Sequence, residues 1–564
     1  MSDTATHSTL TGTGIGQGVV VGVVARMSDP LPEPQDTPSS RTVDEETERA
    51  RASLSVVARD LEARGKTAGG TAADVLEAQA MMAEDPMLSE IIDESLARGT
   101  TAERAVFEAF ASFRDQLAAM GGYLGERAAD LDDVSQRVIA NLSGVAAPGV
   151  PNPDHPFVLV ARDLAPADTA MLDLDKVLGL VTSDGGPTSH TAILAREKSI
   201  VAVVGVTDAA TLADGTTVVV DAAAGTVTAA PSDDQVADAE RRIAEREAAA
   251  VAPVTPGALA DGTAVPLLAN LGSSAGAQAA ADAGAEGVGL FRTEFLFLDA
   301  GGSAPTVEQQ REHYTRLLQA FPGKKVVVRV LDAGADKPLP FLNDAHEENP
   351  ALGLRGLRAL RASEDILREQ LTALADADKA TEADLWVMAP MVSTVEETRY
   401  FVEIAREYGI KTAGVMVEVP SLALLAPQVL AASDFASIGT NDLTQYTLAA
   451  DRMLGSVAAL QDPWHPAVLR LVGEVGAAGA ATGKPVGICG EAAADPLLAV
   501  VLVGLGATTL SMSTPALVDV RASLLKYTID EARQLAEIAL AADGAAESRA
   551  AVAAAALTLK EAQS

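Results

Sequence analysis

Three things are scarce in this chain: cysteine, positive charge and long apolar runs. One cysteine among 564 residues cannot form an internal disulfide, so a reducing cytosol is expected. Lys and Arg number 42 against 78 Asp and Glu, and the resulting net charge of -36 repels nucleic acid and anionic membrane surfaces. No apolar stretch reaches membrane-spanning length, and the first thirty residues lack the basic start and apolar run of a signal peptide. These shortages predict a soluble, cytoplasmic protein, and its length predicts several domains.

One histidine directly follows a glycine turn. Residues 185–192 read Gly-Gly-Pro-Thr-Ser-His-Thr-Ala, after an apolar run at 177–181 that predicts a buried strand. Pro187 fits a first helical turn and Thr188 or Ser189 can cap it, which puts His190 at the start of a helix. Free amides and the helix dipole attract phosphoryl oxygens there, so His190 is a candidate nucleophile that carries phosphate. A neutral histidine that only caps or packs the helix is the alternative, and the motif alone leaves both open.

Between about residues 260 and 530, eight apolar segments alternate with helical stretches. This alternation predicts a parallel sheet, and eight such units fit a closed (β/α)8 barrel. The chemistry of these barrels takes place where strands end and loops begin. The eight segments are Val265–Leu271, Gly287–Glu294, Lys325–Asp332, Leu385–Val392, Gly414–Pro420, Phe435–Asp442, Pro485–Glu491 and Thr509–Ser513.

Polar side chains stand at the ends of all eight predicted strands. Any one of them taken alone is more often a helix cap or part of a surface ion pair, but a complete ring indicates a binding site. Cys489 ends one strand and is a candidate proton donor, although a lone cysteine is usually an inert core residue. In chain order the ring contains Asn270, Arg292 and Glu294, Arg329 and Asp332, Ser393, Glu418, Asn441 and Asp442, Cys489 and Glu491, and Ser511 and Ser513.

The side-chain types in this ring describe the ligand. Glu418 and Asp442 are hard oxygen donors from neighbouring strands, which Mg²⁺ prefers when substrate oxygens and water complete its octahedron. Arg292, Arg329 and Arg452 offer planar forks that match phosphate and carboxylate groups. The expected substrate is therefore small and carries both groups.

Five longer runs are specific enough to indicate a family. They are Gly185–Thr191, Gly289–Phe297, Glu347–Gly353, Ser437–Tyr446 and Gly487–Glu491. In these runs, and over nearly its whole length, the chain resembles Enzyme I of the phosphoenolpyruvate:sugar phosphotransferase system, a phosphoenolpyruvate-protein phosphotransferase. The resemblance implies a multidomain α/β fold, in which a swivelling phosphohistidine domain with an inserted helical subdomain precedes the barrel.

The resemblance also implies a reaction and the residues that perform it. Phosphoenolpyruvate would pass its phosphoryl group to Nε2 of His190 and then to a histidine of the phosphocarrier protein HPr, releasing pyruvate as the first step of sugar uptake. Cys489 would protonate the enolate of pyruvate, and Thr169 would lie beside the phosphohistidine. The family further implies a homodimer formed through the barrel. The substrate would be bound by Arg292, Arg329, Asn441, Asp442 and Arg452, and Mg²⁺ or Mn²⁺ by Glu418 and Asp442.

Two positions depart from the family pattern. Pro187 stands where a polar or basic residue often follows the paired glycines, and Ala335 stands where a glycine is common. Pro187 is compatible with a helix start, so we expect a changed rate and not a lost activity. Ala335 is strained if its position requires a positive φ.

The segment from Val43 to Ser143 predicts helices and no strand. Its 20 acidic and 10 basic side chains leave ten net negative charges, which favours a basic partner, although a solvated acidic face is the alternative. The resemblance names HPr as this partner. Three apolar stripes at helical spacing predict its core: Ala50, Leu54, Val57 and Leu61; Val106, Phe110, Phe113 and Leu117; and Leu131, Val134, Val138 and Leu142. The helix signals are capping boxes at Thr42 with Glu45 and Thr100 with Glu103, stops at Gly65 and Gly99, and a break at Pro86.

These signals divide the chain into five parts. Residues 1–28 and 145–230 are expected to form the phosphohistidine domain, 29–144 the helical HPr-binding subdomain, 231–254 a charged linker helix and 255–540 the phosphoenolpyruvate-binding barrel. Residues 541–564 form an alanine-rich tail that we expect to fray. Because His190 must accept phosphate at the barrel and donate it at the helical subdomain, the linker is expected to act as a swivel.

Two other functions stay open. A pyruvate phosphate dikinase or phosphoenolpyruvate synthase resembles the chain in the histidine motif and the barrel. Those enzymes need a nucleotide-binding domain, however, and the sequence has no glycine-rich nucleotide loop or spare segment for one. The second open function is a non-catalytic signalling scaffold. The ring of reactive side chains argues against it, because a scaffold does not need them.

Overall fold

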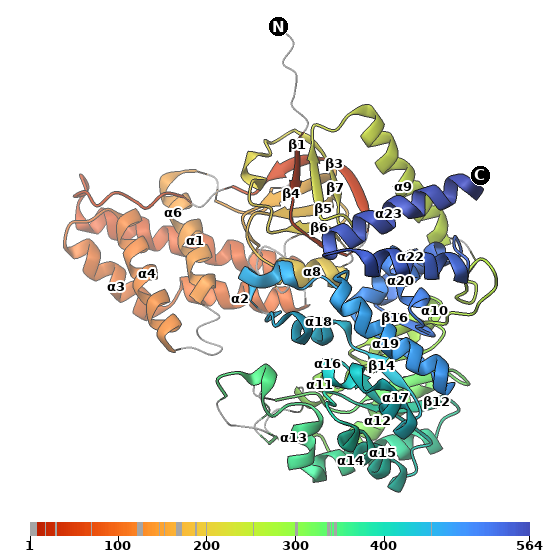
Figure 1. Cartoon of the computed structure of the whole chain (residues 1–564). Helices are drawn as coiled ribbons and strands as arrows, with labels where there is room; N and C mark the ends of the chain where they lie inside the picture. The colour runs from red at the N-terminus through yellow and green to blue at the C-terminus, as the bar shows by residue number, and fades with distance from the viewer. Residues whose placement is uncertain are drawn as a thin grey trace. The chain divides into compact units, whose positions relative to one another are not determined.

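The computed structural model of the chain divides into two compact units, Met1–Ala244 and Glu245–Ser564, each described by itself (Figure 1). The structure describes residues 8–563 apart from 17, 29–30, 69, 121–127, 146, 152, 165–171, 187–188, 199, 252, 299, 301–302, 335–338, 340, 343–346 and 453. In this part of the chain, no helix has the length and apolar composition required to span a bilayer.

An eight-stranded sheet forms the centre of the first unit. Its order is β1-β8-β7-β3-β4-β5-β6-β2, in which β3 to β6 run parallel and the outer pairs run antiparallel. Successive residues such as Leu159 and Val160 enter two separate apolar clusters, because side chains alternate between the two faces of a strand and both faces are covered. The strands are β1 Ser8–Thr11, β2 Thr13–Ile15, β3 Val19–Arg26, β4 Phe157–Ala161, β5 Val177–Thr182, β6 Val201–Val204, β7 Thr217–Asp221 and β8 Thr226–Ala229.

A group of helices is inserted between β3 and β4, which are neighbours in the sheet. The predicted stripes meet in a separate core that contains Leu61, Phe110 and Val138. The capping box before α1 is confirmed, because Thr42 N donates to Glu45 Oε2 over 2.8 Å and Glu45 N donates to Thr42 Oγ1 over 3.3 Å. The helices are α1 Val43–Ala68, α2 Gly70–Ala83, α3 Pro86–Ala97, α4 Ala102–Met120 and α6 Ala128–Ser143, and α8 His190–Lys198 lies between β5 and β6.

Two predicted helix signals in this insertion are wrong. Gly65 does not end α1 but lies buried inside it, where packing outweighs the helix penalty of glycine, about 1 kcal/mol. Thr101 and not Thr100 caps α4, because Thr101 Oγ1 accepts from the Arg104 amide over 3.3 Å. Thr100 Oγ1 instead donates to the Ser95 carbonyl over 2.9 Å.

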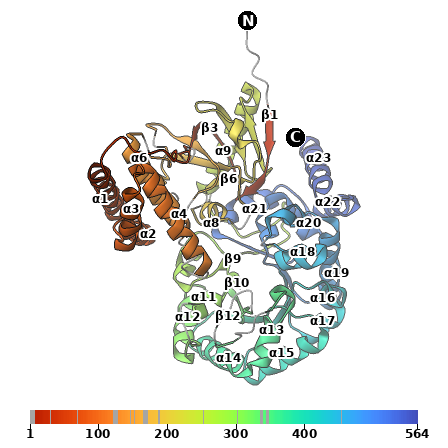
Figure 2. The ribbon, with the colours of Figure 1, turned by 90° about the vertical axis from the view of Figure 1, so that its left-hand side faces the viewer.

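The second unit is a closed barrel of eight parallel strands, as the alternating pattern predicted. Its helices form a ring outside the strands (Figure 2). The strands are β9 Leu267–Leu271, β10 Val288–Phe291, β11 Lys325–Arg329, β12 Asp384–Ala389, β13 Thr412–Val417, β14 Ala436–Ile438, β15 Val486–Ile488 and β16 Thr509–Met512. The helices are α10 Ala277–Asp282, α11 Glu294–Leu298, α12 Val307–Gln319, α13 Leu357–Ala362, α14 Glu364–Lys379, α15 Val395–Glu407, α16 Pro420–Leu424, α17 Ala426–Ala432, α18 Thr440–Leu448, α19 Pro466–Thr482, α20 Pro496–Gly504, α21 Leu517–Leu524, α22 Ile529–Ala541 and α23 Ala545–Gln563.

Two apolar layers hold the barrel together. A large cluster fills the space between strands and helices, and a smaller one fills the interior with residues such as Val327, Met388 and Phe435. Because the interior is packed, a ligand is accommodated only at the open end, where the loops that follow the strands meet.

The charged linker prediction corresponds to α9, Asp233–Val251, and the division between the two units falls within this helix. Arg242 pairs with Asp221 of the first unit over 2.6 Å, and Arg246 pairs with Asp519 of the second over 3.0 Å. On each side of the division, the middle of the helix is thus tied to its own unit.

The prediction that the alanine-rich tail frays is wrong. Residues 545–563 form α23, which buries Val552 and Ala556 in the large apolar cluster of the second unit. Alanine has the highest helix propensity, and these two side chains give the helix an apolar face that tertiary packing stabilises.

Candidate active site

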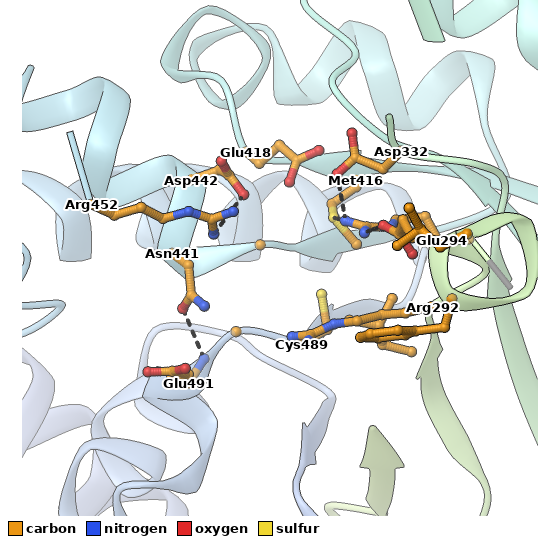
Figure 3. A pocket seen from close by; sticks show the side chains of 16 residues that line it. Arg292, Glu294, Asp332, Met416, Glu418, Asn441, Asp442, Arg452, Cys489 and Glu491 are labelled. Carbon is orange, nitrogen blue, oxygen red and sulfur yellow. Dashed lines mark hydrogen bonds and ion pairs between the residues drawn. The ribbon is translucent and has the colours of Figure 1, made fainter. Parts of the chain in front are cut away.

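A cavity of about 400 Å³ lies at the carboxyl ends of the barrel strands (Figure 3). The parallel direction of the strands explains the position of this cavity, because parallel strands have all their carboxyl ends at the same edge of the barrel. Asn270, Ser393, Ser511 and Ser513 of the predicted ring are not among the residues that line it. The cavity brings together the predicted binding residues and the predicted proton donor: Arg292, Arg329, Glu418, Asn441, Asp442, Arg452 and Cys489.

A buried arginine organises one wall. The Arg329 side chain forms ion pairs with Glu294 and, over 3.1 Å, with Asp332, and all three side chains are less than a tenth exposed. Burial by itself disfavours the charged guanidinium, but the surrounding carboxylates outweigh it and raise the pKa of Arg329. The guanidinium therefore stays charged and oriented before any ligand arrives, although its Nε has no hydrogen-bond partner in the structure.

Sequence reasoning missed Arg355, which joins two parts of the site. This fully buried residue donates from Nη2 to Asp332 over 3.1 Å and lies 3.5 Å from Asp442 Oδ1 through Nη1. Its position two residues after the run Glu347–Gly353 was the available signal. Arg355 links the loop after β11 to the start of α18 and offsets the charge of both carboxylates.

Carboxylates crowd the part of the cavity next to this arginine. Burial, together with the charges of Asp442 and Asp332, raises the pKa of Glu418 to about 8. The amide of Met391 donates to Glu418 Oε1 over 2.6 Å and fixes the side chain. Repulsion of this kind is what a bound cation relieves.

The donor set fits a divalent metal ion only in combination with substrate. Among the described residues, no group of three or more His, Cys, Asp or Glu side chains is arranged to hold a metal. Two buried carboxylates, Glu418 and Asp442, remain as oxygen donors, and Asp442 Oδ1 has no hydrogen-bond partner. Mg²⁺ is commonly held by one or two carboxylates plus substrate oxygens and water, so the residues present suit it.

The remaining two arginines stand nearer to solvent. Arg452 places Nη1 3.4 Å from Asp442 Oδ2, and its amide donates to Gln445 Oε1 over 3.0 Å. Arg292 follows β10 directly, with its amide bound to the Leu271 carbonyl over 2.8 Å and its side chain exposed. Both positions leave a guanidinium available to a ligand in the cavity.

The single cysteine lies at the cavity as a protonated thiol. Cys489 is 2% exposed, and its Sγ donates to the Ile438 carbonyl over 3.5 Å. Burial raises the pKa of this thiol to about 11, so it carries its proton at neutral pH. The charge of Glu418 acts in the same direction as burial, while the charges of Arg329 and Arg292 act against it.

Amide side chains hold the backbone around this thiol. Asn441 Oδ1 accepts from the Glu491 amide over 3.0 Å, and Asn270 Nδ2 donates to the carbonyls of Cys489 and Ser511 over 3.0 and 3.2 Å. Asn270 and Ser511 of the predicted ring thus support the site from outside the cavity. Ser393 of the predicted ring has a different partner, because its Oγ accepts from Arg358 Nη2 over 2.8 Å.

The described residues of the histidine motif have the predicted backbone. Gly185 has φ +88°, which glycine adopts readily, and α8 begins at His190. Ser189 Oγ caps the helix by accepting from the Ala192 amide over 3.2 Å, and Thr191 Oγ1 donates to Asp163 over 2.9 Å. Thr169, Pro187, Thr188 and Ala335 lie outside the described residues.

Comparisons with known proteins agree with this architecture. Three family models match: PEP-utilising enzyme, N-terminal, at residues 11–127; the mobile domain of PEP-utilising enzymes at 153–225; and their PEP-binding domain at 246–529. The fold and the cavity are thus those of the PEP-utilising enzymes.

Similarity to individual proteins narrows this class. The phosphoenolpyruvate-protein phosphotransferase of Streptomyces coelicolor is 53% identical over 96% of this chain and 98% of its own length. Those of Haloferax volcanii and Geobacillus stearothermophilus are 42% and 38% identical, over 85% and 97% of this chain and 86% and 98% of their own lengths. The chain therefore belongs to the enzyme family of the phosphoenolpyruvate-protein phosphotransferases, Enzyme I, which confirms the resemblance found in the sequence. Enzymes of this kind are generally metal-dependent.

Proposed function

We propose that the chain transfers the phosphoryl group of phosphoenolpyruvate to His190 and then to a histidine of HPr, releasing pyruvate as the first step of sugar uptake. The observation that carries this proposal is the cavity, which combines several guanidinium groups, two metal-type carboxylates and one protonated thiol. Phosphoenolpyruvate carries a phosphate, a carboxylate and a carbon that must gain a proton, so each group of the substrate has a counterpart.

The arginines of the cavity bind and orient the substrate. Arg329 is held rigid by Glu294 and Asp332, while Arg292 and Arg452 are reachable from solvent. Their planar forks suit the phosphate and the carboxylate of phosphoenolpyruvate, and Asn441 and Asp442 complete the binding set. Charge that develops on the transferring group is thereby neutralised by side chains already in place.

Glu418 and Asp442 would hold Mg²⁺, or Mn²⁺ in its place. When bound, the ion neutralises phosphate charge and orients the substrate oxygens. Both carboxylates are buried, and burial together with the charge of Asp442 raises the pKa of Glu418, which favours binding of a cation here.

The transfer breaks the bond between phosphorus and the enol oxygen and forms a bond between phosphorus and Nε2 of His190. The enolate left behind accepts a proton at its terminal carbon from the Cys489 thiol, which yields pyruvate and a thiolate that regains its proton from solvent. A neutral imidazole is required for the attack, so phosphorylation slows as acid protonates the ring.

The phosphohistidine then donates to HPr at the acidic helical insertion, residues 29–144, with Thr169 beside the imidazole. The ten net negative charges of its part from Val43 to Ser143 favour a basic partner through faster encounter. The proposal includes a homodimer formed through the barrel, with α9 as the swivel between the two units. It places the protein in the cytoplasm, where its one cysteine stays reduced.

Labelled phosphoenolpyruvate with Mg²⁺ tests the function. We expect the chain to acquire label that survives alkali but not acid, and the variant His190→Ala to acquire none. Pyruvate release should then require HPr for more than one turnover. Labelling by ATP without phosphoenolpyruvate would instead support an activity like that of pyruvate phosphate dikinase, and failure to release pyruvate with HPr present would support a scaffold.

A further inference from the structure

The C-terminal helix α23 contacts the loop that carries Arg452. This loop, residues 449–465, of which residue 453 lies outside the described residues, runs from the end of α18 to the start of α19. Arg549 of α23 places Nη2 3.4 Å from both carboxylate oxygens of Asp462. Its guanidinium also lies 5.6 Å from the centre of the Trp464 ring, within the range of a cation–π contact.

The end of the loop that Arg549 contacts is firmly anchored in the barrel. Trp464 is 1% exposed, and its Nε1 donates to Asp495 Oδ2 over 2.9 Å. Asp462 Oδ1 accepts from the Trp464 amide over 3.0 Å, so the carboxylate that Arg549 binds also shapes the backbone of the loop. Loss of Arg549 would leave this carboxylate without its guanidinium and the indole without its cation.

A second set of hydrogen bonds connects this anchored end to the active site. Gln461, next to Asp462 in the chain, donates from Nε2 to the Ala450 carbonyl at the front of the loop. Two residues further on, the Arg452 amide donates to Gln445 Oε1, and its guanidinium reaches Asp442 in the cavity. A continuous set of contacts therefore runs from α23 to the Arg452 side chain.

We propose that Arg549 is a positioning residue for phosphoenolpyruvate binding, because its hold on Asp462 keeps the loop 449–465 in the arrangement that directs Arg452 into the cavity. This inference rests on the proposed role of Arg452 in binding phosphoenolpyruvate. The Arg549 and Asp462 side chains are 38% and 31% exposed, so the pair is partly screened by solvent. The expected loss of affinity is therefore moderate, about threefold to tenfold.

The experiment compares variants of the full chain. In the His190→Ala background, where no transfer occurs, we expect Arg549→Ala to raise the Kd of phosphoenolpyruvate, measured by calorimetry with Mg²⁺, about threefold to tenfold. In the chain with His190, it should raise the KM for pyruvate release with HPr by a similar factor, with kcat within about twofold of the unchanged chain. Arg549→Lys keeps the charge but loses the planar fork, so it should recover part of the loss. Arg533→Ala removes a matched arginine of α22 whose partner Asp530 is 88% exposed, and it should change neither constant.

Two further measurements separate positioning from stability. In an Arg452→Ala background, Arg549→Ala should add no further increase in Kd, because the residue through which it acts is gone. The chain has two tryptophans, so Trp386→Phe leaves Trp464 as the single reporter of the loop, and its fluorescence should shift on Arg549→Ala without substrate.

The outcomes that overturn the inference differ from those that overturn the function. A lower melting temperature with an unchanged Kd, or an equal increase in Kd in the Arg452→Ala background, would reduce Arg549 to a structural contact. If the unchanged chain transfers no phosphoryl group from phosphoenolpyruvate, the proposed function fails, whatever the Arg549 variants do.

Discussion

The helix that begins at His190 is capped by the residue next to it in the chain, whereas the barrel cavity is held by ion pairs between distant segments. Ser189 caps α8 through an amide only three residues away. Next to the cavity, Arg355 bonds to the lining residue Asp332 and lies near Asp442, which is 87 residues further along the chain than Arg355. A nucleophile that must travel gains from a support that moves with it, while a charged substrate is best bound by groups fixed in advance across many elements.

The largest effect that tests this comparison is expected from Arg329→Met. The change leaves the carboxylates of Glu294 and Asp332 buried without their guanidinium, so we expect the second unit to lose about 3–5 kcal/mol of unfolding free energy and the chain to lose activity. Urea unfolding followed by circular dichroism measures the loss.

A surface ion pair in the same unit provides the control for that variant. Arg316→Met removes an ion pair with Glu312 in which both side chains are at least half exposed. It should lower the free energy of unfolding by about 1 kcal/mol or less. Equal losses of unfolding free energy in Arg329→Met and Arg316→Met would show that burial does not determine the strength of the ion pairs at the cavity.

The next largest effect is expected from Cys489→Ala. Removing the proton donor should slow pyruvate formation about 100-fold or more, because proton transfer from a positioned group is lost. Binding of phosphoenolpyruvate should change little, since the thiol takes no part in charge recognition. Rapid-quench measurement of pyruvate tests this, and an unchanged rate would assign the proton to another donor.

The pKa of the same thiol makes a separate prediction. Alkylation needs the thiolate, and the pKa of about 11 means that its fraction keeps rising roughly tenfold per pH unit through pH 9 to 10 in the folded chain. The chain unfolded in urea should reach its maximum rate at lower pH. Iodoacetamide labelling followed by mass spectrometry makes the comparison, and a plateau below pH 9 in the folded chain would contradict it.

The smallest effect is expected at the cap of α8. Ser189→Ala removes one cap hydrogen bond and should lower the free energy of unfolding of the first unit by about 1 kcal/mol. Thr394→Ala removes a similar cap, 3.1 Å, from α15 in the barrel and should cost about as much. Only Ser189→Ala should slow phosphorylation, because only α8 begins with the proposed nucleophile; equal phosphorylation rates in both variants would show that the cap does not align it.

Much of the fold was predictable because its signals are periodic or local. Apolar runs separated by helical stretches identified all eight barrel strands, and the glycine turn at Gly185 located the start of α8. The helical stripes in the insertion were found for the same reason. Local signals failed where tertiary contacts compete, as at Gly65, which packing keeps inside α1. The domain boundaries and the roles of single site residues stay predictions.

The cavity was predictable in composition but not in arrangement. Strand ends pointed to Arg329, Glu418 and Asp442, but no spacing rule pairs Arg355 with Asp332 or separates Ser393 from the cavity. Those outcomes depend on loop paths, which follow from long-range packing. The helix α23 was missed for a related reason, since an alanine-rich run gives no sign of the surface against which it packs.

The sequence by itself determined the strand and helix alternation, the family and the set of reactive side chains, since these follow from local periodicity and from motifs contiguous in the chain. Only the tertiary structure decided which of those side chains share a cavity, that Cys489 keeps its proton and that Arg549 reaches the loop of Arg452. Burial and the charge around each group change its chemistry, and both are properties of segments that meet only after folding.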